Sequence, residues 1–168
     1  MPTTFTKIAS ATVGSGGAAS IDFTSIPSTY TDLVLKISAR TTRSNYTDAI
    51  SLSLNGVSTN QTSLYLEGNG SSTASGSLTS FRTIASSATA TASTFGNSEY
   101  YIPNYAGSNN KSASSDGVSE NNASDASAWL VANLWSQTAA ITSISVTDLN
   151  SATFVQYTTA TLYGIKKS

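Results

Sequence analysis

Apolar residues recur at every second position along most of this chain, and that spacing leaves little choice of fold. A period of two places alternate side chains on opposite faces of a β-strand. No window of about eleven residues or more shows the i, i+3, i+4, i+7 spacing of an amphipathic helix. The sequence therefore predicts an all-β protein.

The first half of the chain shows the alternation most clearly. It predicts strands over residues 21–26, 33–40 and 50–54, the first of which ends at Pro27. Asn55-Gly56 follows the third strand directly, and this dipeptide favours a type I′ hairpin turn. We therefore expect a return strand over residues 63–67.

The second half contains a strand over residues 128–135, with Trp129, Val131, Asn133 and Trp135 on one face. Because both of its faces are largely apolar, we expect it to be central and covered on both sides. Further strands are predicted around residues 144–146 and over 154–165. The last would place Val155, Tyr157, Thr159, Thr161 and Tyr163 on one face.

Glycine, serine and asparagine mark the connections between these strands. Residues 14–17, 68–76 and 104–125 read as loops, and 84–94 as a thin strand or a loop. Residues 1–20 are expected to form an N-terminal strand or arm. Short strands separated by turn residues favour a sandwich. We predict one domain, 1–168, folded as a single antiparallel β-sandwich that is jelly-roll-like.

The charge of the chain is low, at 10% charged residues and a net charge of −1. Eight basic residues spread along the sequence argue against a nucleic-acid partner. No apolar run approaches the ~20 residues that cross a bilayer, and no basic N-terminal segment precedes an apolar one. We expect no membrane association and synthesis in a cytoplasm without a secretory signal.

The chain has neither histidine nor cysteine, which excludes Ser-His-Asp and Cys-His catalysis and imidazole-ligated metals. A carboxylate glycosidase remains an alternative, but no spacing selects a catalytic pair among the acids. We expect surface and turn roles for them, no enzymatic activity and no cofactor. These acids are Asp22, Asp32, Asp48, Glu67, Glu99, Asp116, Glu120, Asp125 and Asp148.

Asp116, Glu120 and Asp125 share one asparagine-rich segment. Calcium requires six to eight oxygen ligands, and the EF-hand pattern is not met, so a solvated loop is favoured over a calcium site. Gly68-Asn69-Gly70 lacks the strand-turn-helix context of a phosphate loop. Asn-X-Ser/Thr triplets are expected by chance in such a composition. They begin at Asn45, Asn60, Asn69, Asn110 and Asn122.

Two aromatic groups are candidate contact sites. Trp129 and Trp135 project from one strand face ~20 Å apart, so core or interface anchors are favoured over a sugar platform. Tyr100, Tyr101 and Tyr105 cluster near Pro103. For these tyrosines, packing at a strand end is favoured over a contact surface.

Several segments resemble a family of small virion proteins of tailed bacteriophages, frequent in phages of aquatic bacteria. The similar segments, in the same order, are Ile21 to Arg40 with its Ile26-Pro27 and Tyr30-Thr31, Leu54-Asn55-Gly56, Ile102 to Ala106 with Lys111, Leu134-Trp135 with Ala140 to Ile144, and Ala160 to Lys166. The likeness spans residues 20–168, but 57–95 and 107–126 do not align.

This resemblance implies a structural protein of the virion and carries over no catalytic residues. We expect a capsid decoration or cement protein that forms a homotrimer and binds the outer surface of the major capsid shell. The alternative is a tail-fibre tip or receptor-binding protein, whose long polar loops, 104–125 above all, contact a host glycan or protein. Phe154, Tyr157 and Tyr163 are expected in the sandwich core or at a symmetry axis.

Overall fold

The computed structural model describes residues 4–120, 122 and 126–166. These residues contain twelve strands and no helix, as the alternation predicts. The strands are β1 (Phe5–Thr12), β2 (Ser20–Phe23), β3 (Asp32–Ala39), β4 (Thr47–Leu54), β5 (Gln61–Gly68), β6 (Thr73–Leu78), β7 (Phe81–Ser86), β8 (Gly96–Ile102), β9 (Lys111–Ser119), β10 (Ser127–Trp135), β11 (Ile144–Asp148) and β12 (Thr159–Ile165).

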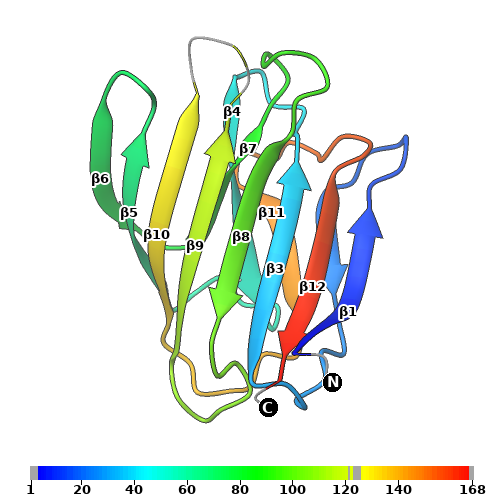
Figure 1. The fold of residues 1–168 in the computed structure, drawn as a ribbon, viewed down its shortest axis with the longest axis vertical. Helices are drawn as coiled ribbons and strands as arrows, with labels where there is room; N and C mark the ends of the chain where they lie inside the picture. Colours follow the sequence, from blue (N-terminus) through cyan, green and yellow to red (C-terminus); the bar gives the residue numbers. More distant parts are fainter. Residues whose placement is uncertain (1–3, 121, 123–125, 167–168) are drawn as a thin grey trace.

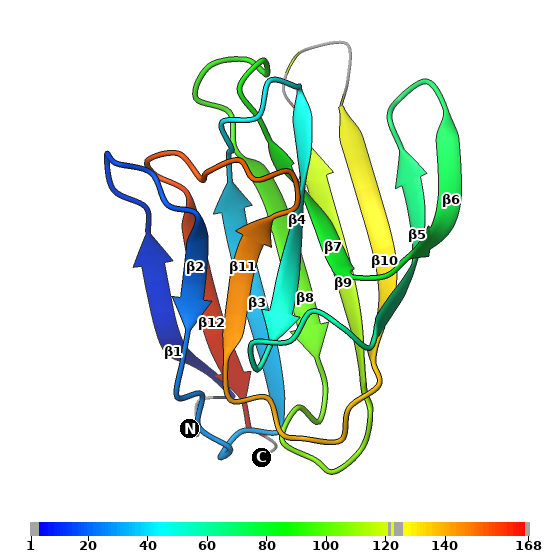
Figure 2. The same cartoon turned by 180° about the vertical axis from the view of Figure 1, so that it is seen from behind.

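The strands form two antiparallel sheets packed face to face (Figures 1 and 2). The larger sheet has eight strands in the order β1-β12-β3-β8-β9-β10-β5-β6, and the smaller has four in the order β2-β11-β4-β7. The prediction of an antiparallel β-sandwich is confirmed. Because the larger sheet is wider, β5 and β6 extend beyond the smaller one at one side (Figure 2).

One half of the interior is apolar. Here the inward faces of β3, β8 and β12 meet β2, β4 and β11, and the predicted alternation is observed. Burial of these side chains supplies the main driving force for folding, at about 25 cal/mol per Å² of apolar surface. The side chains include Ile21, Phe23, Leu33, Leu35, Ile37, Ile50, Leu52, Leu54, Ile144, Val146 and Leu162.

The other half of the interior, where β7 packs against β8, β9 and β10, contains a set of small polar side chains beside apolar ones such as Ile84 and Val131. Thr83 donates to Ser98 at 2.8 Å, Ser86 bonds Ser119 at 2.9 Å, and Asn133 joins Ser63 (2.7 Å) and Ser115 (3.0 Å). We call this set, Ser63, Thr83, Ser86, Ser98, Ser115, Ser119 and Asn133, the hydroxyl layer. Its groups satisfy one another, as buried polar groups must.

Gly117 shows how closely the sheets approach in this layer. A Cβ at Gly117 would lie 2.2 Å from Thr83 Oγ1 and 2.9 Å from Ser98 Oγ. Any side chain at this position, even the methyl group of alanine, would therefore force the sheets apart locally.

The predicted loop over residues 104–125 is wrong, because residues 111–119 form β9. In this strand the inward positions are Lys111, Ala113, Ser115, Gly117 and Ser119, all buried. Their alternation is in size and burial rather than in hydropathy, so no apolar period marks the strand.

The predicted turn at Asn55-Gly56 is confirmed, with φ values of 53° and 73° and reciprocal backbone bonds between Leu54 and Val57. The return strand exists as β5, but it pairs with β10 and β6 in the other sheet. Gln61 lies where the chain passes from the smaller sheet into β5 of the larger sheet. Its side-chain amide donates to Leu52 O (3.1 Å) and accepts from Phe81 N (3.0 Å), bridging to the smaller sheet.

Three further boundaries differ from expectation. The Gly/Ser stretch over 68–76 is a short turn between β5 and β6, which begins at Thr73. The segment 84–94 is strand only to Ser86. The last strand begins at Thr159 rather than 154, because the chain turns at Tyr157, where φ is +72°.

Phe154 is buried in the core as expected, whereas Tyr157 is 68% exposed.

The expectation that the strand over 128–135 is covered on both sides is half right. β10 is internal, between β9 and β5, and its inward face is buried apart from a half-buried Trp129. Its outward side chains, Ala128, Leu130, Ala132 and Leu134, are exposed.

Candidate functional site

The uncovered face of β10 continues onto β5. Pairing places Leu130 opposite Leu66, and Ala132 opposite Leu64. Opposed residues in a β-ladder lie on the same face, so the leucines of both strands project outward together. We call Leu64, Leu66, Leu130 and Leu134, with Ala128 and Ala132, the leucine face.

The leucine face is strongly exposed. Leu64, Leu66 and Leu130 retain 65%, 61% and 59% of their surface, and Leu134 retains 37%. Single exposed leucines are common on proteins, but a contiguous set on two paired strands is a candidate interaction surface.

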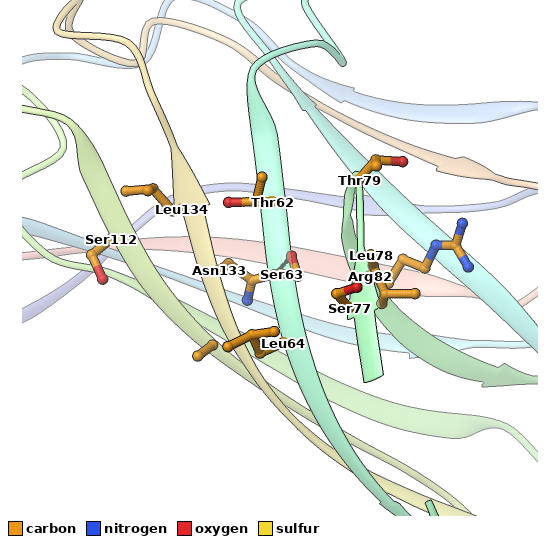
Figure 3. A pocket seen from close by; sticks show the side chains of 11 residues that line it. Thr62, Ser63, Leu64, Ser77, Leu78, Thr79, Arg82, Ser112, Asn133 and Leu134 are labelled. Carbon is orange, nitrogen blue, oxygen red and sulfur yellow. Dashed lines mark hydrogen bonds between the residues drawn. The ribbon is translucent and has the colours of Figure 1, made fainter. Parts of the chain in front are cut away.

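An open groove of about 770 Å³ lies over one end of the leucine face. Figure 3 shows Leu64 and Thr62 projecting from β5 and Leu134 from β10, with Arg82 extending away from them. A second depression, between Leu66, Leu130 and Ser75, adjoins it. The surface is therefore shallow and extended rather than a single enclosed pocket.

Hydroxyls rather than charges border the leucine face. Ser75 and Ser77 of β6 lie opposite Leu66 and Leu64, while Ser112 and Ser114 of β9 lie opposite Leu134 and Ala132. The charged residue nearest to the leucine face on these strands is Asp116 of β9, which pairs with Leu130 of β10. Depletion of charge at the centre of a patch is the composition typical of protein interfaces.

The acidic residues considered as calcium ligands are not brought together in the described structure. Asp116 lies on the outer face of β9, and Glu120 follows the end of that strand, where its carboxylate accepts from Asn122 N at 2.7 Å. Asp125 lies outside the described residues. Among the described residues, no three Asp, Glu, His or Cys side chains form a group that fits a metal.

A carboxyl pair that the sequence does not reveal is formed by Asp48 and Asp148. Asp48 is buried and accepts from Thr41 (2.6 Å), Arg43 (3.1 Å) and Asn150 (2.8 Å). Burial and a hydrogen bond with Asp48 raise the pKa of Asp148 to about 6. The two carboxyls touch, leaving no room for the sugar that a glycosidase pair must flank. Their contact joins β4 to β11, strands that are distant in sequence.

A small pocket beside Asp48 is also lined by Glu67 and Trp129. Its volume is about 150 Å³, below the 300–1,000 Å³ usual for small-molecule sites. Glu67 accepts from Ser127 at 2.7 Å. This pocket does not offer space for a glycan.

The aromatic candidates separate into core and surface. Trp135, Tyr100 and Tyr105 are buried, as favoured for these residues. Trp129 is half-buried and stacks on Tyr65, with ring centroids 5.0 Å apart. Tyr101 lies on the outer face and donates to Asp32 at 2.9 Å, while Tyr163 contacts Phe5.

The polar side chains of Arg40 and Asn55 hold irregular chain in place. Arg40 donates to four carbonyls of the loop after β7, those of Ala88, Ala90, Thr91 and Thr94, at 2.9–3.2 Å. Asn55 donates to Ala140 O (2.8 Å) and accepts from the backbone of Thr142 and Ser143. These side chains supply the bonds that loops cannot make within a ladder.

Lys111 and Tyr30 also hold neighbouring chain in place, Lys111 through hydrogen bonds and Tyr30 through packing of its ring. Lys111 is buried, and its Nζ donates to the carbonyls of Gly107, Asn109 and Thr138; burial lowers its pKa. The ring of Tyr30 lies against Gly164, where a Cβ would come within 2.3 Å of it. Both side chains therefore fix the fold, and a buried lysine whose ammonium donates to three carbonyls is not placed as a nucleophile.

The remaining motif of interest, Gly68-Asn69-Gly70, forms the turn between β5 and β6. Asn69 Oδ1 accepts from the backbone N–H groups of Ser71 (3.1 Å) and Ser72 (2.8 Å). The side chain thus closes a turn rather than cradling a phosphate.

Comparison with models of known families, with curated proteins and with solved structures finds no match to this chain. Within residues 4–120, 122 and 126–166, no helix is long and apolar enough to cross a membrane. The leucine face is therefore the candidate functional site, and the two apolar sides of residues 128–135 are its signal in the sequence.

Proposed function

We propose that this chain is a structural protein of a bacteriophage particle that acts by binding rather than by catalysis. Its role is that of a capsid decoration or cement protein on the outer surface of the major capsid shell. The observation that carries this proposal is the leucine face, an uncharged apolar surface that no other part of the described chain covers. The ordered similarity to phage virion proteins supplies the class of partner.

The leucine face suits a shell partner for a physical reason. Covering three side chains that are each about 60% exposed removes apolar surface from water, which favours association without charge steering. A particle presents many identical sites, so weak contacts at each chain combine by avidity when the protein is oligomeric. The proposed oligomer is made of copies of this chain.

We also propose that the topology is jelly-roll-like. Setting aside β1, β9, β10 and β12 leaves eight of the twelve strands, four in each sheet. The chain then visits the smaller and larger sheets in the order β2, β3, β4, then β5 and β6 together, then β7, β8 and β11. This double Greek key is common in viral capsid domains.

Quantitative mass spectrometry of purified particles tests the role. Hundreds of copies per particle, comparable with the major capsid protein, are expected. A handful of copies would indicate a tail position and favour the receptor-binding alternative, and absence from the particle would refute the proposal.

A pair of matched variants tests the surface. Leu130→Glu places a charge in the leucine face and is expected to weaken binding to shells lacking the protein by at least about tenfold. Leu149→Glu changes another exposed leucine, outside that face, and is expected to bind as the parent protein does. Equal binding by both variants would exclude the leucine face as the shell contact.

A further inference from the structure

The described part of the sandwich has four edge strands, and three of them are protected against pairing. β1 contains Lys7 and a register shift between Lys7 and Ala9. β2 has only four residues and includes the exposed Asp22. β7 carries Arg82 and packs across the sandwich on β8, β9 and β10. Charges, bulges, short length and coverage are the devices by which proteins block edge-to-edge association.

The fourth edge, β6, has none of these devices. Its six residues, Thr-Ala-Ser-Gly-Ser-Leu, contain no charge and no proline. All six pair with β5 in continuous register, without a bulge. In the described residues β6 is hydrogen-bonded to β5 alone, so its other side presents unpaired backbone N–H and C=O groups.

The surroundings of β6 leave that side accessible. The strand lies at the end of the part of the larger sheet that extends past the smaller one (Figures 1 and 2). Thr73, Ala74, Ser75 and Ser77 are exposed. Apart from Leu78 its side chains are small, so a strand can approach from outside without a steric barrier.

The occupant that fits this edge is β6 of another copy. Every other edge of a second copy is short, charged, bulged or covered. Antiparallel self-pairing places each strand opposite itself, which is unfavourable when like charges face one another and acceptable for an uncharged strand. We propose that β6 pairs with β6 of a second copy about a two-fold axis near Ser75 and Gly76, joining the two larger sheets into one.

Such pairing keeps both leucine faces on the same side of the joined sheet, because opposed residues of a ladder share a face. A two-fold contact is isologous and closes at two copies. It therefore gives a dimer in place of the trimer expected from the sequence. This inference goes beyond the virion role and does not depend on it.

Sedimentation velocity over a range of concentrations measures the association directly. The parent chain is expected to form a dimer, and Ser75→Lys, which faces like charges across the axis, to raise its dissociation constant by at least about tenfold. Ser10→Lys makes the same change on the opposite edge strand, β1, and is expected to leave the dimer unchanged. Circular dichroism and melting temperature of each variant establish that it is folded.

Cross-linking gives a second readout that does not depend on weakening the contact. The chain has no cysteine, so Ser75→Cys introduces a single thiol. Opposed strand residues lie within the Cα separation that a disulfide spans, so Ser75→Cys, alone or mixed with Ser77→Cys, is expected to form an intermolecular disulfide. Ser10→Cys is expected not to do so.

Hydrogen exchange of the β6 amides locates the contact, with protection expected to increase with protein concentration. A monomer at all concentrations, a trimer, or a dimer whose β6 amides exchange as fast as in the monomer would each overturn the proposal. Particle mass spectrometry is independent of this result, so the virion role and the β6 contact fail separately.

Discussion

At the scale of single residues, two buried tyrosines differ in whether their hydroxyls are satisfied. Tyr100 Oη is buried without a hydrogen-bond partner, and burial raises its pKa well above the usual value. The hydroxyl of Tyr105 donates to the carbonyl of Pro27. An unsatisfied buried polar group costs about 1–3 kcal/mol, whereas a satisfied one contributes about 1 kcal/mol.

Tyr100→Phe is therefore expected to stabilise the protein by about 1 kcal/mol, and Tyr105→Phe to destabilise it by about the same amount. Both changes remove one hydroxyl from a fully buried ring, so each is the control for the other. Urea unfolding measures both free energies. A Tyr100→Phe variant less stable than the parent would show that this hydroxyl has a partner.

Asp148 gives a pH dependence with a definite sign. Its pKa is about 6 in the folded protein, against 3.8 ordinarily, so the folded state holds this proton more tightly than the unfolded state. The contribution of protonated Asp148 to the free energy of unfolding is therefore complete below pH ~4 and is lost as pH rises through ~6. The charged groups beside it are Asp48 and, bonded to Asp48, Arg43.

Asp148→Asn keeps the oxygen that accepts from Asn150 and Ala152 and removes the titration. We expect parent and variant to be similarly stable at pH 4, and the variant to be more stable at pH 7. The gain is on the order of 1 kcal/mol, because solvent screens this partly exposed carboxyl. Thermal unfolding at both pH values measures it, and a difference that does not change with pH would contradict the assignment.

At the scale of strands, the close approach of β9 and β7 depends on one glycine. Gly117→Ala is expected to destabilise the protein by about 1–3 kcal/mol, because its Cβ would clash with Thr83 and Ser98 in the hydroxyl layer. Gly68→Ala is the control: no atom lies within 4 Å of a Cβ there, so its effect should be small or slightly stabilising. Equal losses in denaturant unfolding would exclude the packing explanation.

The same strand shows where sequence reasoning succeeds and fails. β3, β4 and β11 were predictable, because their inward positions are large and apolar. β9 was not, since its inward positions after Lys111 are the small residues Ala113, Ser115, Gly117 and Ser119, which carry no apolar period. The turn at Asn55 was predictable from two residues, but not the destination of the next strand, which depends on tertiary bonds such as those of Gln61.

The surface features of the molecule also differ in whether the sequence predicts them. The two apolar sides of residues 128–135 predicted coverage on both faces, and in the described residues the outer face is exposed. The β6 edge carried no sequence signal, because a Ser/Gly strand resembles a loop. The Asp48–Asp148 pair joins residues one hundred positions apart, which spacing alone does not bring together.

At the scale of the whole molecule, the hydroxyl layer has a thermal consequence. Unfolding exposes apolar surface, which raises heat capacity by about 0.45 cal/mol/K per Å², and polar surface, which lowers it by about 0.26. The seven buried serine, threonine and asparagine side chains of the hydroxyl layer shift this balance toward the polar contribution. We expect a heat-capacity increment of unfolding below the usual ~12–15 cal/mol/K per residue, measurable by scanning calorimetry. The stability curve would then be flatter, and the free energy of unfolding would change less between cold and warm conditions than in a sandwich filled with leucine.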